Sequence, residues 1–159
     1  MSRYVVVAPL TPMSVGDRFI TREWPLHVTL VQVFTSEATA AAIGQRLAAV
    51  ADGSPTITVL AGDDEDFGPS RTIPVTVMEP SRTLHALHAA CVAAIDGLGP
   101  VYANPEYMGA GYRPHVTVKR QGRVSAGDVL ELRQVALVDM DPGQRDGGRE
   151  VLAVCALGR

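Results

Sequence analysis

The hexamers PLHVTL and RPHVTV place the same His-Val-Thr triplet in both halves of the sequence. The first triplet contains His27 and Thr29, and the second contains His115 and Thr117. Both hexamers are rich in β-branched residues, which favour strands, and side chains alternate between the two faces of a strand. Each triplet therefore presents an imidazole beside a hydroxyl on one face and an apolar side chain on the other.

The rest of the sequence predicts more strands than helices. Ser36 is expected to cap a helix over residues 37–52, with Glu37 in its first turn. Pro80 and Ser81 are expected to open a second helix that reaches about Ile95. β-Branched runs between turn residues predict the strands, at 3–8, 25–34, 54–62, 71–79, 113–120, 129–139 and 149–157.

Three stretches rich in Gly, Pro or charge are predicted to be irregular. They are 9–24, 63–70 and 97–112, and the second is expected to be an acidic hairpin tip with Phe67 tucked beneath it. Strands and helices do not alternate as they do in a doubly wound sheet. We therefore predict one α+β domain over residues 1–159 with largely antiparallel pairing.

Charge and composition exclude several classes of partner. A formal net charge of −3 argues against bulk electrostatic binding of long duplex nucleic acid, although local cations can still hold a small phosphate. No apolar run approaches the roughly 18 residues of a membrane span, and the start of the sequence resembles a strand rather than a secretory signal. Cys91 and Cys155 form no CxxC or Cys/His cluster and are expected to be buried thiols. We expect a cytoplasmic monomer.

Two imidazoles facing one cleft suit phosphodiester chemistry. An unperturbed histidine titrates near neutral pH, so one ring can be neutral while the other is protonated. The neutral ring accepts a proton from the attacking hydroxyl or water, and the protonated ring donates one to the departing oxygen. The threonine hydroxyls can donate hydrogen bonds to the non-bridging phosphate oxygens. This scheme requires no metal and no cofactor.

Two H-x-T motifs on strands, in a chain of this size, resemble the 2H phosphoesterase superfamily. Its members include 2′-5′ RNA ligase-like proteins and cyclic phosphodiesterases. The resemblance extends to both helices, the TITVLAGDDEDFGPSRTIPVTV hairpin and the aromatic-Arg-Pro run before the second motif. It implies a bilobal, pseudo-twofold fold, with largely antiparallel sheets lining a central groove and helices outside. By the same resemblance, His27 and His115 would be the acid/base pair, and Thr29 and Thr117 would bind phosphate.

The resemblance also implies substrate contacts outside the motifs. Family members often carry a basic residue soon after the second motif, and Lys119 and Arg120 follow it here. Strand alternation places Lys119 on the face of His115, unless a bulge exchanges it for Arg120. Both could instead be ordinary charges on an edge strand.

The stacking residue for a nucleobase departs from the family pattern. Many members carry an aromatic residue just after the first motif, and Phe34 comes later than that here. Tyr112 is therefore our candidate substrate-binding aromatic, with Trp24 and Phe67 as alternatives. Tyr112 could equally serve as a packing residue at the start of its strand.

We predict a metal-independent phosphodiesterase acting on a 2′,3′-cyclic phosphate or on a 2′-5′-linked or cyclic oligonucleotide. Its partner would be a small nucleotide or an RNA end, in RNA processing or in the removal of a nucleotide signal. One alternative is a module that binds a nucleotide without turnover. Another is a metal-dependent hydrolase that uses His85 and His88, although a role in helix packing is favoured for this pair.

Overall fold

The computed structural model describes residues 2–143 and 148–158 of the chain. The helices are α1 (Ala40–Asp52) and α2 (Arg82–Asp96), and the single 3-10 turns are η1 (Thr21–Glu23), η2 (Pro105–Tyr107) and η3 (Gly109–Gly111). The strands are β1 (Ser2–Pro9), β2 (Arg18–Ile20), β3 (His27–Ser36), β4 (Ile57–Phe67), β5 (Ile73–Met78), β6 (Val101–Tyr102), β7 (His115–Thr117), β8 (Val129–Leu132), β9 (Gln134–Asp139) and β10 (Gly148–Ala156).

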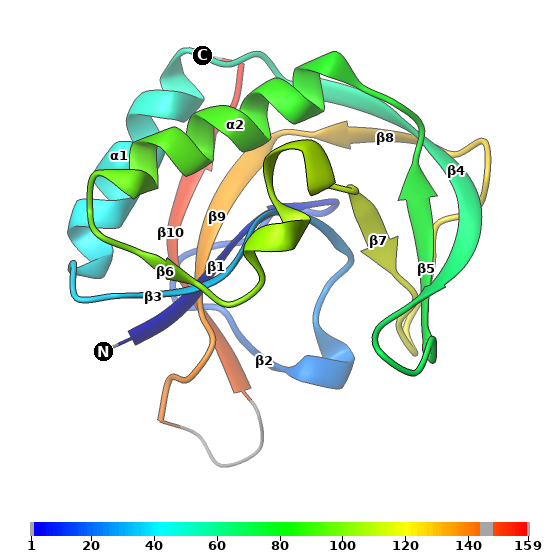
Figure 1. The fold of residues 1–159 in the computed structure, drawn as a ribbon, viewed down its shortest axis with the longest axis horizontal. Helices are drawn as coiled ribbons and strands as arrows, with labels where there is room; N and C mark the ends of the chain where they lie inside the picture. The colour runs from blue at the N-terminus through cyan, green and yellow to red at the C-terminus, as the bar shows by residue number, and fades with distance from the viewer. Residues whose placement is uncertain (1, 144–147, 159) are drawn as a thin grey trace.

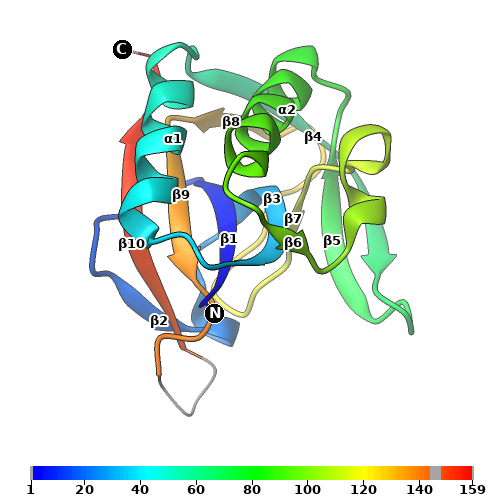
Figure 2. The same cartoon turned by 60° about the vertical axis from the view of Figure 1, so that its left-hand side comes forward.

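The strands form a curled antiparallel sheet in which the two motif strands are central neighbours. The strand order is β2-β10-β9-β1-β3-β7-β5-β4-β8, with β6 added beside β3. Both helices cover the same side of this sheet (Figures 1 and 2). The α+β class and the antiparallel pairing predicted from the sequence are confirmed.

Two apolar clusters support the sheet, one on each side. The larger cluster joins the helices to the sheet through residues such as Leu47, Leu84 and Phe34, all 0% exposed. The smaller cluster lies on the other side, where Met13 and Trp24 cover β1, β9 and β10. The central valines of both motifs belong to the larger cluster, so their histidines face away from the helices.

The two helices differ in how well the sequence predicted their beginnings. Helix α2 begins as predicted, because the Ser81 side chain accepts a hydrogen bond from the Leu84 amide. The predicted cap of α1 was wrong, because Ser36 is the last residue of β3. Thr39 caps α1 instead and accepts from the Ala42 amide, which leaves Glu37 outside the helix.

Two further predictions were wrong, one for a strand in the C-terminal half and one for the first loop. The predicted strand 129–139 is two strands, because β8 pairs with β4 whereas β9 pairs with β1 and β10. Residues 129–139 therefore occupy two separate positions in the sheet, one at the edge beside β4 and one between β1 and β10. The predicted loop 9–24 contains β2 and η1, and β2 becomes an edge strand beside β10.

The acidic segment after Gly62 is a strand and not a hairpin tip. Strand β4 continues through Phe67, so that Glu65 pairs with Val75 and Phe67 with Ile73. The turn comes later, at Gly68, where φ is +92° and the Arg71 amide donates to the Gly68 carbonyl. This extension carries Phe67 to the second motif instead of beneath a loop.

Of the two thiols that the sequence predicted to be buried, one is buried and one is partly exposed. Cys91 is fully buried, and burial raises the pKa of its thiol to about 12. Cys155 is a free thiol as well but is partly exposed, which is less buried than predicted. Among the described residues, no helix is long and apolar enough to cross a membrane.

Candidate active site

The four side chains of the two motifs share one face of the sheet at its centre. Strands β3 and β7 are antiparallel, and Val28 pairs with Val116. This register places His27 opposite Thr117 and Thr29 opposite His115. Each imidazole therefore has a hydroxyl beside it on its own strand and another across the strand pair. The four side chains are related by a local twofold axis through the Val28–Val116 pair, in agreement with the pseudo-twofold arrangement that the family resemblance implied.

Each histidine is fixed by a main-chain carbonyl two residues before it. The Nδ1 atom of His27 lies 2.8 Å from the Pro25 oxygen, and that of His115 lies 2.8 Å from the Arg113 oxygen. A carbonyl only accepts, so each Nδ1 must carry the proton and donate it. In the described part of the chain, nothing hydrogen-bonds either Nε2. Both Nε2 atoms are thus available to exchange a proton with a ligand.

An aromatic ring flanks each imidazole, but the two rings come from unrelated places. The Trp24 ring lies 4.2 Å from that of His27 at an interplanar angle of 32°. The Phe67 ring, from the end of β4, meets His115 edge-on at 4.7 Å. Both were candidate stacking residues from the sequence alone, and both lie beside the motifs. The Arg113 guanidinium lies 5.2 Å from the Phe67 ring centre and pairs with Glu65 at 2.5 Å.

Burial makes both imidazoles weaker bases than a free histidine. Desolvation lowers the pKa of His27 to about 4, and the bond to Pro25 opposes this shift. The nearby charges of Lys119 and His115 lower it further. The pKa of His115 is also lowered, chiefly by burial and in part by Arg113. Both rings are therefore neutral in the unliganded protein at neutral pH, and His27 stays neutral well into the acid range.

The two basic residues after the second motif occupy different positions. The Lys119 ammonium donates to the Thr21 oxygen at 3.2 Å, and it lies close enough to His27 to lower the pKa of that ring. Lys119 thus lies near the motif face, as strand alternation predicted. Arg120 is exposed in the tight turn closed by Lys119 and Gly122.

Tyr112 lies on the helix side of the sheet, away from the motif side chains. It is 4% exposed, and its ring stacks on that of His88 at 3.9 Å. Its hydroxyl donates to the Thr29 carbonyl at 2.7 Å. The side chain is thus used in packing and is covered from any ligand at the motifs, so the substrate-stacking alternative for Tyr112 is not supported.

The helix histidines also have structural roles. His88 is 2% exposed; its Nδ1 donates to the Leu30 carbonyl at 2.6 Å, and its Nε2 accepts from the Gly109 amide at 3.0 Å. Both nitrogens are therefore engaged. The Nδ1 of His85 bonds the Ser81 carbonyl at 3.0 Å. Within residues 2–143 and 148–158, no three His, Cys, Asp or Glu side chains gather as a metal site would require.

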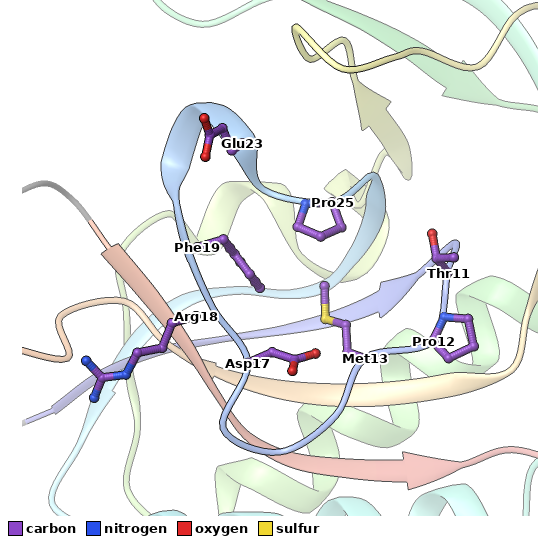
Figure 3. A pocket seen from close by; sticks show the side chains of 8 residues that line it. All are labelled: Thr11, Pro12, Met13, Asp17, Arg18, Phe19, Glu23 and Pro25. Atoms are coloured by element: carbon purple, nitrogen blue, oxygen red, sulfur yellow. The ribbon is translucent and has the colours of Figure 1, made fainter.

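A hollow of about 380 Å³ lies next to the first motif but does not include its side chains. The lining residues come from the segment between β1 and β3 and are Thr11, Pro12, Met13, Asp17, Arg18, Phe19, Glu23 and Pro25 (Figure 3). Two carboxylates are among them, and Arg18 is paired with Glu150. This hollow is therefore poorly suited to an anionic ligand, and the motif face remains the candidate site.

This site and its fold define a two-histidine phosphoesterase. The family model of the 2′-5′ RNA ligase superfamily matches residues 9–137, and the chain belongs to that family, the 2H phosphoesterases. Its fold is similar to a crystal structure described as a phosphoesterase, with 18% identity, a TM-score of 0.62 and 99% of each chain covered.

Two named proteins share the fold. Escherichia coli LigT, solved in complex with 3′-AMP, is 17% identical, with a TM-score of 0.62 and 99% of each chain covered. The protein TT0787 of Thermus thermophilus is 17% identical, with a TM-score of 0.57 and 99% of each chain covered. Comparison with the curated proteins gave no match.

Proposed function

We propose that this chain is a phosphodiesterase that uses His27 and His115 as general base and general acid, without a metal. The proposed substrates are 2′,3′-cyclic phosphates and 2′-5′-linked or cyclic oligonucleotides. One observation carries the proposal: on two paired strands, both Nδ1 atoms donate to carbonyls, which leaves each Nε2 in the tautomer that can accept a proton from a ligand. LigT has been solved with 3′-AMP and with ATP, which supports a nucleotide as the ligand class here.

His27 is assigned the role of general base because burial keeps it in the neutral form. Its pKa of about 4 means that Nε2 carries a free lone pair across the neutral range. In the hydrolysis of a cyclic phosphate, Nε2 takes a proton from water as the water oxygen bonds to phosphorus. A base this weak transfers protons with less driving force, so its position beside the nucleophile must contribute to the rate.

His115 then supplies the proton to the leaving oxygen. The phosphate carries a negative charge, and an anion beside the imidazole raises its pKa and favours the charged form. The bond from phosphorus to the ester oxygen breaks as Nε2 of His115 protonates that oxygen. Lys119 lies near His27 and would offset part of the charge on the phosphate. Arg120 is a second candidate contact for a longer substrate, because it is exposed near the motifs.

Turnover of a substrate panel tests this function. Purified protein would be incubated with the four 2′,3′-cyclic nucleotides, 2′-5′ dinucleotides and cyclic di- and trinucleotides, with EDTA present. We expect at least one substrate to be cleaved at a rate that EDTA leaves unchanged. Binding without cleavage would indicate the non-catalytic alternative. Cleavage that EDTA abolishes and a divalent metal restores would contradict the two-histidine mechanism.

A further inference from the structure

We propose that Trp24 is the positioning residue of His27: its indole excludes water from the imidazole and holds the ring oriented for proton removal. The inference rests on the proposed function for its catalytic consequence. The physical claim, that Trp24 controls the protonation of His27, can be measured without any substrate. The two claims can therefore fail separately.

Trp24 is placed to act on one histidine only. It closes η1, three residues before His27, and it is 6% exposed. Its ring packs against His27 on one side and stacks with Phe19 at 5.8 Å on the other. Pro25 lies between them in sequence and supplies the carbonyl that holds Nδ1 of His27. The indole and the carbonyl therefore fix the same imidazole from two directions.

The segment that follows the second motif holds Trp24 in place. Gln121 donates from Nε2 to the Trp24 carbonyl at 2.7 Å, and Lys119 donates to the carbonyl of Thr21, at the start of η1. Arg149 adds a cation 5.7 Å from the indole centre. These contacts connect the two halves of the molecule beside His27. The position of the indole thus depends on the segment that follows the second motif.

Phe67 does not give His115 an equivalent environment. Its ring meets His115 edge-on and is only partly buried, near the turn of the β4–β5 hairpin. An aromatic face laid against the imidazole covers more of that ring than an aromatic edge does. We therefore expect Trp24 to remove more water from His27 than Phe67 removes from His115.

The charges around His27 set the sign of the expected change. The groups that act on it are the Lys119 ammonium and His115, and Arg149 lies beyond the indole. Each of these is positive when charged, so none stabilises a protonated His27. Burial remains the largest cause of the lowered pKa of His27. Admitting water at Trp24 should therefore raise the pKa toward the ordinary value of about 6.5.

The test is an NMR titration of both motif histidines in four variants. Trp24→Leu removes the indole, and Trp24→Phe keeps an aromatic ring. Gln121→Ala removes the hydrogen bond to the Trp24 carbonyl and leaves the buried ring unchanged. This variant tests the role of Trp24 if Trp24→Leu fails to fold. Phe67→Leu is the matched control, because it removes the aromatic neighbour of His115 alone.

We expect the pKa of His27 to rise by about one unit or more in Trp24→Leu and to rise in the same direction in Gln121→Ala. Trp24→Phe should recover most of the original value, and Phe67→Leu should leave His27 unchanged. In a cleavage assay between pH 7.5 and pH 5, Trp24→Leu should lose about twofold more activity than the parent if the pKa of His27 rises by one unit, and about tenfold more if it rises by two, because the base becomes protonated.

Either of two titration results would overturn the inference. One is an unchanged His27 pKa in Gln121→Ala and in every folded Trp24 variant. The other is an equal rise of His27 in Phe67→Leu. A shifted His27 in a protein that cleaves nothing from the panel would instead contradict the proposed function and leave the role of Trp24 in place.

Discussion

At the scale of single residues, the site depends on two imidazoles whose tautomers are set by the chain itself. His27 and His115 each donate from Nδ1 to the carbonyl two residues earlier. A proline with a fixed φ lies beside each of these contacts. Pro25 itself supplies the carbonyl for His27, whereas Pro114 directly precedes His115. The tautomer of each histidine therefore does not depend on a carboxylate partner.

Replacing either histidine with alanine should remove the cleavage activity. His27→Ala and His115→Ala each delete a proton-transfer group, and such groups typically contribute about 10²–10⁴-fold. We expect a rate loss of that size in each variant, with the far-UV circular dichroism spectrum retained. Full activity in either variant would contradict the assigned pair.

The motif threonines should affect the rate more than the stability. Thr29→Val and Thr117→Val keep the β-branched shape and remove only the hydroxyl. Since both side chains are partly exposed on the ligand face, we expect little change in unfolding free energy. Loss of a hydrogen bond that forms as charge develops should raise the barrier by about 2–4 kcal/mol, measured as kcat. Equal rates for parent and variants would mean that the hydroxyls only favour strands.

At the scale of elements, the critical contact is the thin junction between β3 and β7. These strands are paired at a single position, Val28 with Val116. Tyr112, three residues before the second motif, adds a second connection by donating its hydroxyl to the Thr29 carbonyl. The residue that the sequence suggested as a substrate contact thus joins the two motifs from behind.

Tyr112→Phe isolates this connection, because it keeps the ring stacked on His88 and removes the hydroxyl. We expect the unfolding free energy to fall by about 1 kcal/mol, as for one internal hydrogen bond. Urea denaturation would measure this loss, and amide hydrogen exchange at Val28 and Val116 should accelerate. Tyr107→Phe is the control, because Tyr107 is 52% exposed and should change neither. Unaltered exchange in Tyr112→Phe would show that the Val28–Val116 pair suffices.

The sequence located both motif strands, but it predicted the second one too long, at 113–120 against His115–Thr117 in the structure. Alternation placed His27 with Thr29 and His115 with Thr117, and the family resemblance implied that the two pairs come together. The side of the sheet on which Tyr112 lies could not be predicted, because Tyr112 precedes the strand by three residues and alternation along the strand does not reach it. The stacking of its ring on His88 of α2 decides the side.

Long-range pairing explains the other differences. Residues 129–139 look like one strand because their β propensity is continuous. In the structure, however, the first part of this segment pairs with β4 and the second part pairs with β1. The acidic run at 63–66 has the composition of a turn, but pairing with β5 and ion pairs from Arg113 and Arg123 hold it extended. Thr39 displaced Ser36 as a cap because β3 continues through Ser36 beside β1.

At the scale of the whole molecule, the histidines make stability depend on pH. The pKa values of His27, His88 and His115 are all lowered in the folded protein. The unfolded chain therefore binds more protons than the folded one below about pH 6.5, and protonation favours unfolding.

Stability should accordingly fall as the pH drops from about 6.5 toward 4. For His27 alone, the loss is on the order of 3 kcal/mol, from about 1.4 kcal/mol per pKa unit. Urea denaturation at several pH values would measure it. His27→Gln should flatten the dependence, and the parent slope persisting in that variant would assign the effect to other groups.

The local twofold axis through Val28 and Val116 has a consequence for regiochemistry. A 2′,3′-cyclic phosphate has two ester oxygens in nearly equivalent positions, so turning it by half a revolution presents either one to the same histidine. The four motif side chains alone do not distinguish these orientations. Their surroundings do, because Trp24 covers one imidazole and Phe67 only borders the other. The ratio of 2′- to 3′-monophosphate formed from one substrate would therefore measure the difference in activation free energy between the two substrate orientations. That difference expresses how far the site departs from twofold symmetry.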